Sequence, residues 1–150
     1  MPVEDNISLM RRWYREVWRE RKNETIHELL ASNAPLYGQT GPGEKIVGPD
    51  GFVAFAENIR RAFPDTELEI EDIFAVDDKV AIRWTAKGTH MGNFLGMDPS
   101  GAQVRISGMT IVHIENGKII AGWDSWDRLQ MMKQIGADSE PGTIPLAKTA

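Results

Sequence analysis

The segment TELEIEDIFAVDDKVAIRWTA, residues 66–86, points most directly to the fold class. Polar and apolar residues alternate along it with a period of two, which is typical of β-strands with one solvent-exposed face. The pair Asp77-Asp78 interrupts the alternation and suits a turn. We therefore predict an antiparallel hairpin. Its apolar face would hold Leu68, Ile70, Phe74 and Val76 from the first strand and Val80, Ile82, Trp84 and Ala86 from the second.

Helices are expected upstream of this hairpin, because apolar residues there recur at steps of three and four. The predicted helices cover about 5–22, 23–30 and 50–63. The segment 33–49 is rich in glycine and proline, so it is expected to be a loop that could hold a short extended piece.

Two more strands and a closing helix are expected downstream. The strands are predicted over 103–115 and 118–126, and the helix before Gly136. Helices segregated from an antiparallel sheet define an α+β fold. We predict one α+β domain over residues 1–136, with a curved antiparallel sheet around the first helix, a conical cavity between them, and a tail over 137–150.

The pair Asn116-Gly117 is a strong signal for a two-residue hairpin loop between the last two strands. If the pairing of the two strands is unbroken, this loop determines every cross-strand residue pair that follows it. The predicted cross-strand pairs nearest the loop are Glu115 with Lys118 and Ile114 with Ile119. Farther along, they are Thr110 with Trp123, Gly108 with Ser125, and Ile106 with Asp127. This register turns Asp127 toward the apolar interior. It puts Asp124 on the opposite face, as either a second site carboxylate or a solvated one.

Asp127 and His90 are the candidate catalytic residues. A carboxyl group against apolar walls has a raised pKa, which suits it to proton transfer. The alternative for Asp127 is that it caps the last helix. His90 continues the inward phase of the strand that carries Trp84, between glycines that give a ligand access. The alternative for His90 is a hydrogen-bonded core residue.

Composition excludes several classes of protein. The chain of 150 residues has no cysteine, which rules out disulfides and zinc–thiolate sites. Its net charge of −5 argues against a nucleic-acid partner. No apolar run approaches the roughly 20 residues that span a bilayer, and the N-terminus lacks a signal-peptide pattern, so we expect a cytoplasmic protein without membrane contact. The three histidines are too scattered for a metal motif, so no metal site is expected.

A set of short motifs resembles the SnoaL-like polyketide cyclases, of the nuclear-transport-factor-2-like superfamily. The resemblance runs from about Gly48 to Gly136. It rests on the motifs Ala62-Phe63-Pro64-Asp65, Gly88-Thr89-His90-Met91-Gly92-Asn93-Phe94, Pro99-Ser100-Gly101, Trp123-Asp124-Ser125-Trp126-Asp127 and Gln134-Ile135-Gly136, in this order. It implies a cone-shaped α+β barrel, a homodimer, and ring closure by intramolecular aldol condensation without metal or cofactor. An aspartate at the start of the last helix, matched by Asp127, would shuttle the proton.

These observations together predict a cyclase-type enzyme for a small, largely apolar carbonyl compound. Asp127 would be the general acid and base, and His90 would be either its partner or a group that polarises the substrate carbonyl. The expected walls are aromatic: Tyr14, Trp18, Phe55, Trp84, Phe94 and Trp123. The alternatives are an isomerase, a dehydratase or an epoxide hydrolase on the same fold, or a dimeric ligand-binding domain without turnover. An epoxide hydrolase would need Arg83 inside, but the phase of Arg83 is opposite to that of Trp84.

Overall fold

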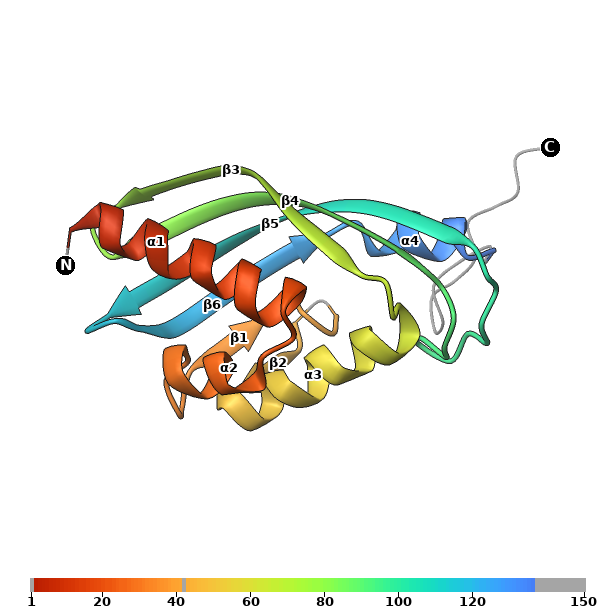
Figure 1. The fold of residues 1–150 in the computed structure, drawn as a ribbon, viewed down its shortest axis with the longest axis horizontal. Helices are drawn as coiled ribbons and strands as arrows, with labels where there is room; N and C mark the ends of the chain where they lie inside the picture. Colours follow the sequence, from red (N-terminus) through yellow and green to blue (C-terminus); the bar gives the residue numbers. More distant parts are fainter. Residues whose placement is uncertain (1, 42, 137–150) are drawn as a thin grey trace.

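A computed structural model describes residues 2–41 and 43–136 of the chain. Its helices come mainly from the N-terminal half, as the step of three and four residues predicts (Figure 1). They are α1 (Val3–Trp13), a π-helical continuation η1 (Tyr14–Arg19), α2 (Asn23–Leu29), α3 (Gly48–Ala62) and α4 (Arg128–Gln134). The start of α3 lies before the predicted Asp50, because Gly48 and Pro49 already belong to the helix. The predicted tail over 137–150 lies outside the described residues.

The strands form one six-stranded sheet in the order β2-β1-β6-β5-β4-β3. They are β1 (Pro35–Tyr37), β2 (Lys45–Val47), β3 (Glu67–Val76), β4 (Lys79–Thr89), β5 (Gln103–Glu115) and β6 (Lys118–Trp126). Strand β1 runs parallel to β6, and the other neighbours are antiparallel. The predicted α+β class is confirmed. The expected loop 33–49 holds the small β1–β2 hairpin, which extends the sheet beyond β6.

The sheet is curved and does not close, and the long strands arch over α1 and α3 (Figure 1). The helices cover its concave face, and the main core lies between the two layers. The core joins the inner sides of α1, η1 and α2 to those of β4, β5 and β6. A smaller cluster around Met131 and Met132 packs α4 against the other end of the sheet. No helix of the described residues is long and apolar enough to cross a membrane.

A β-bulge in β3 reverses which of its side chains face inward. Ile70 pairs with Trp84, but the next pair is Asp72 with Arg83, so Glu71 is the extra residue. An extra residue shifts the period of two by one, which exchanges the two faces. The predicted inward orientation of Phe74 and Val76 is therefore wrong. Both side chains are 62% exposed on the outer face, and Ile73 and Ala75 pack against the core instead.

A second bulge, in β6, has the same effect near the end of the chain. The predicted pairs Glu115 with Lys118 and Ile114 with Ile119 are confirmed, but His113 pairs with Ala121, which leaves Ile120 as the extra residue. All later pairs then move by one. The predicted pairs Thr110 with Trp123, Gly108 with Ser125 and Ile106 with Asp127 are wrong. Thr110 pairs with Asp124 and Gly108 pairs with Trp126.

Candidate active site

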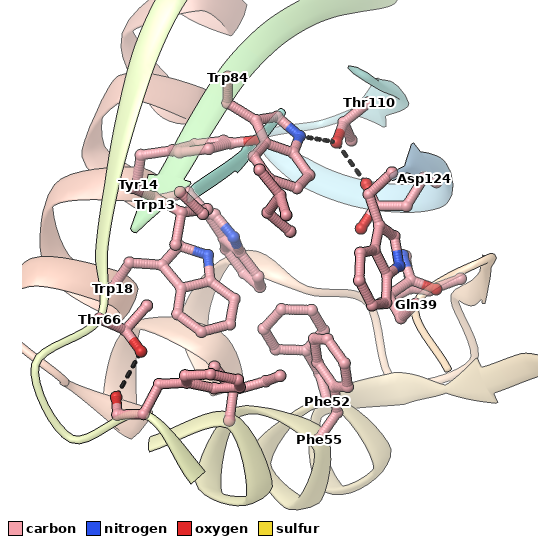
Figure 2. A pocket seen from close by; sticks show the side chains of 18 of the residues that line it. Trp13, Tyr14, Trp18, Gln39, Phe52, Phe55, Thr66, Trp84, Thr110 and Asp124 are labelled. Carbon is pink, nitrogen blue, oxygen red and sulfur yellow. Dashed lines mark hydrogen bonds between the residues drawn. The ribbon is translucent and has the colours of Figure 1, made fainter. Parts of the chain in front are cut away.

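A cavity of about 140 Å³ lies between the concave face of the sheet and the helices (Figure 2). An apolar protein cavity of roughly 150 Å³ can hold a benzene ring, so this space suits an aromatic or alicyclic ligand. Its wall is rich in aromatic rings, which come from both layers: Trp13, Tyr14, Trp18, Phe52, Phe55, Phe63, Trp84, Phe94 and Trp126. The side chains that bring polar atoms to it are few: Tyr14, Gln39, Thr66, Lys87, Thr110 and Asp124.

The helical wall of the cavity contains the π-helical turn η1. Backbone hydrogen bonds from Glu20 to Arg15 and from Lys22 to Glu16 span five and six residues, which widens the helix. Tyr14 and Trp18 lie in this turn and line the cavity with Trp13. Isolated π-helical turns occur frequently at functional sites.

Of the described residues that line the cavity, Asp124 carries the only carboxyl group. The bulge at Ile120 turns this side chain inward, to the same face as Thr110. The Thr110 hydroxyl donates a hydrogen bond to Oδ1 of Asp124, and Thr110 Oγ1 accepts one from Trp84 Nε1 at 2.9 Å. Figure 2 shows this chain of three side chains along the sheet side of the cavity. The chain fixes the orientation of the carboxyl group.

Gly108 makes this chain of hydrogen bonds sterically possible. It is the cross-strand partner of Trp84, and the indole lies directly over it. A Cβ atom at position 108 would overlap the indole ring atoms of Trp84. Glycine in a strand interior is otherwise unfavourable, and it often marks such a close approach.

Burial raises the pKa of Asp124 to about 6, and the hydrogen bond from Thr110 opposes part of this rise. As a whole residue, Asp124 retains some accessible surface. Burial likewise raises the pKa of Tyr14 far above its usual range, and the nearby Asp124 carboxylate adds to this effect. At neutral pH the cavity therefore presents a carboxylate that can take a proton beside a phenol that stays neutral.

Five of the six aromatic residues predicted as walls surround this cavity: Tyr14, Trp18, Phe55, Trp84 and Phe94. The sixth, Trp123, does not. It is 41% exposed on the outer face of the sheet, where its ring stacks on Tyr37 with centroids 5.9 Å apart. The bulge at Ile120 is the cause, since it exchanges the faces of Trp123 and Asp124.

Asp127 lies outside the cavity, so the prediction that it points into the apolar interior is wrong. Its side chain is exposed and accepts a hydrogen bond from the backbone N–H of Gln130 at 3.1 Å. This bond caps the N-terminus of α4. The alternative recognised from the sequence, a capping role, is the one that the geometry supports.

His90 is fully buried but is not among the residues that line the cavity. Its Nδ1 is 2.9 Å from Ser100 Oγ and accepts a hydrogen bond from the Ser100 backbone N–H at 3.2 Å. The ring also packs against Phe63 with centroids 5.5 Å apart. His90 therefore holds the loop that follows β4, and the structure does not bring it together with Asp124 or Asp127.

No sequence pattern marks Thr110 or Gln39 as a site residue. Thr110 is inward by its own phase on β5, but its hydrogen bond to Asp124 depends on the bulge. Gln39 follows β1, which lies in the segment expected to be a loop. The described residues contain no group of three or more His, Asp or Glu side chains that could hold a metal ion.

Comparison with known proteins shows which family this chain belongs to. Residues 8–135 match the sequence model of the SnoaL-like polyketide cyclases. The chain belongs to the SnoaL-like polyketide cyclase family. One relative of this chain is the aklanonic acid methyl ester cyclase DauD of Streptomyces sp. (strain C5). It is 26% identical over 141 residues, which cover 93% of this chain and 84% of the relative.

Solved structures support the SnoaL-like fold. IdmH of Streptomyces antibioticus, a proposed polyketide cyclase, is 26% identical with a TM-score of 0.74, over 87% of this chain and 97% of IdmH. A proposed SnoaL-like polyketide cyclase of Jannaschia sp. CCS1 has a TM-score of 0.81 at 22% identity, over 90% of this chain and 94% of that one. At this low identity, the Jannaschia structure shows a shared fold and no more.

Proposed function

We propose that this protein is a cyclase that closes a ring in a flat, largely apolar keto compound, with Asp124 as general base and then general acid. The observation that carries the proposal is the position of Asp124. It is the one carboxyl group among the described residues that line an aromatic cavity, and burial raises its pKa to about 6. Such a group is ionised at neutral pH, yet its conjugate acid is strong enough to return a proton.

The proposed reaction is an intramolecular aldol addition. The Asp124 carboxylate removes a proton from the carbon next to a carbonyl group, and the electron pair of the C–H bond forms an enolate. The enolate carbon attacks a second carbonyl group of the same molecule, which forms the C–C bond and leaves an alkoxide. The protonated Asp124 then gives its proton to the alkoxide, so the enzyme returns to its starting state and the product is an isomer of the substrate.

Tyr14 is proposed to stabilise the charge that develops on the substrate oxygen. Its hydroxyl stays protonated because burial and the Asp124 carboxylate raise its pKa. A neutral donor in an apolar cavity stabilises an enolate more strongly than water does, because the surroundings screen the interaction less. Thr110 holds the carboxyl group through Oδ1 and leaves Oδ2 for the substrate.

The curated relative suggests a first substrate to assay. DauD is named for aklanonic acid methyl ester. We therefore propose this ester as the first substrate to assay, and the aromatic walls of the present cavity suit a compound that contains a ring.

An epoxide hydrolase is less well supported than a cyclase. Such an enzyme of this fold would need an arginine beside its aspartates. Arg83 lies on the outer face, where it is exposed and pairs with Asp72 at 3.5 Å. None of the described residues that line the cavity is an arginine. An isomerase or a dehydratase would use the same base, so the product of the reaction separates these alternatives from ring closure.

The test compares two aspartates that stand three positions apart. With aklanonic acid methyl ester as substrate, we expect Asp124→Asn to lower kcat at least about 100-fold, the lower range for loss of a general base. Asp127→Asn should keep the wild-type kcat, because asparagine caps a helix as well as aspartate does. Ring closure is followed by chromatography with mass detection, since substrate and product have the same mass. Full activity in Asp124→Asn, or a loss confined to Asp127→Asn, would contradict the assignment.

We also propose that the protein is a homodimer that associates through the outer face of the sheet. One row of side chains crosses five strands on this face, and each member is the cross-strand partner of the next: Phe74, Ala81, Ile111, Trp123 and Tyr37. Within this outer row, Phe74 is 62% exposed and Ile111 is 47% exposed. Contiguous apolar surface of this kind is unusual on a monomer and is typical of an interface. A second copy fits, because a two-fold axis would bring the row against itself.

A further inference from the structure

Gln39 is a buried polar residue of the cavity that the proposed reaction does not use. Its side chain lines the cavity and the residue is only 5% exposed. Its Oε1 atom is buried and has no hydrogen-bond partner among the described residues. A buried amide oxygen without a partner destabilises a protein. A residue that carries this cost at the wall of a cavity is a candidate for binding a ligand.

The chain on both sides of Gln39 is held firmly in place. The carbonyl oxygen of Gly38 accepts a hydrogen bond from Trp126 Nε1 at 3.2 Å, and the carbonyl oxygen of Thr40 accepts one from Arg128 Nη1 at 3.1 Å. Gly38 also has a positive φ of 87° and packs so closely on the Asp124 backbone that a Cβ would overlap the Asp124 carbonyl oxygen. Gln39 is thus fixed beside the strand that carries the proposed base.

Other side chains also have a buried unpaired atom, and they help to separate a binding role from simple burial. They include Asn6, through Oδ1, Arg60, through Nε, and His90, through Nε2. None of these three residues lines the cavity. Gln39 therefore combines an unpaired acceptor with a position in the wall of the cavity that Asp124 also lines. Figure 2 shows Gln39 on the same side of the cavity as Asp124, opposite the rings of α1 and η1.

We propose that Gln39 binds the substrate by accepting a hydrogen bond from a hydroxyl group on its ring system, while Asp124 acts on the carbon next to the carbonyl group. This inference rests on the proposed function, since it concerns the same cavity. The unpaired atom is an acceptor, so a donor group of the ligand satisfies it. The terminal torsion of a glutamine side chain is soft, so rotation about it can turn Oε1 toward the cavity.

The experiment uses ligands that bind without ring closure. The probes are 1-tetralone and three of its hydroxylated analogues, 5-, 6- and 7-hydroxy-1-tetralone, and affinities are measured by titration calorimetry. Each probe has one carbonyl group, so it cannot complete the intramolecular reaction. The proteins are the wild type and Gln39→Met, which replaces the amide by an apolar side chain of similar length. Gln39→Leu serves as a second variant if Gln39→Met does not fold.

In the wild type, we expect at least one hydroxylated analogue to bind about tenfold more tightly than 1-tetralone, the contribution of one good hydrogen bond. In Gln39→Met this preference should vanish, while the affinity for 1-tetralone stays the same or improves. Equal affinities in the wild type would overturn the proposal. So would a preference that survives in Gln39→Met or Gln39→Leu.

Two further measurements separate this binding role from a structural role of the Gln39 amide and from the cyclase assignment itself. Without ligand, Gln39→Met should raise the Tm by about 2–4 °C, because an unpaired buried oxygen is removed. A fall in Tm would mean that the amide has a structural role. In Asp124→Asn, the hydroxyl preference should persist. If Asp124→Asn keeps full ring-closing activity while the preference still depends on Gln39, the cyclase assignment fails and the binding role stands.

Discussion

The buried carboxyl group of Asp124 makes folding stability depend on pH in a way that one substitution can reveal. Burial raises its pKa from 3.8 to about 6. Between these two values the unfolded chain releases the proton but the folded chain keeps it, so stability falls as the pH rises through this window. Above about pH 7 the folded protein must hold a charge in apolar surroundings. Asp124→Asn removes that charge and keeps the shape of the side chain.

The expected gain follows from the size of the pKa shift. A shift of roughly two units corresponds to about 3 kcal/mol. We lower the expectation to about 2–3 kcal/mol because Asp124 as a residue retains some accessible surface, and solvent screening reduces the penalty. Asp124→Asn should therefore be more stable than the wild type by this amount at about pH 8, and by less than about 1 kcal/mol at pH 4. At pH 8, this gain corresponds to a rise in Tm of roughly 4–12 °C.

The assay is urea unfolding of both proteins at several values between about pH 4 and pH 8, with the difference in unfolding free energy as the result. The matched control is Asp127→Asn, which makes the same chemical change at an exposed helix cap and should change stability by less than about 0.5 kcal/mol at every pH. A gain for Asp124→Asn that is equal at both ends of the range would refute the reasoning. A loss of stability at pH 8 would refute it as well.

Two further predictions concern the neighbours of Asp124 and the outer face. Thr110→Val should move the acid limb of the kcat/KM profile, expected near pH 6, to higher pH, because the Thr110 hydrogen bond lowers the pKa of Asp124. It should also cost about 1–3 kcal/mol in urea unfolding, since an indole N–H loses its acceptor. A limb that stays in place would contradict the role of Thr110. Ile111→Lys should convert a dimer to a monomer in light-scattering chromatography, whereas Met91→Lys, at an exposed residue outside the sheet, should not. A monomeric wild type, or an Ile111→Lys dimer, would rule out this interface.

The sequence was sufficient to predict the fold class and most element boundaries, because these depend on local periodicity. The helical step of three and four residues located the helices, and the Asn116-Gly117 pair located the β5–β6 turn. It also gave the first pairs after that turn correctly. The β1–β6 pairing was missed, because it joins segments far apart in the chain and β1 spans only three residues.

The orientations of the site residues were harder to predict, because each bulge reverses the period-two pattern for the rest of its strand. Local signals did exist. Glu71-Asp72 places two polar residues in succession, and Ile119-Ile120 places two apolar ones, where strict alternation would forbid both. A reading that allowed one extra residue at either pair would have turned Phe74 outward and Asp124 inward. From the sequence alone, however, an unbroken ladder is the simpler interpretation.

The bulge at Ile120 links the two surfaces on which the proposals depend. Because side chains alternate along a strand, one extra residue turns Asp124 into the cavity and at the same moment turns Trp123 out onto Tyr37. The proposed base and the proposed dimer contact therefore arise from the same irregularity in β6. A substitution at the outer row that shifted this register would change activity as well as assembly. The measurement of kcat in a monomeric Ile111→Lys protein separates the two effects, since Ile111 lies on β5 and leaves the bulge intact.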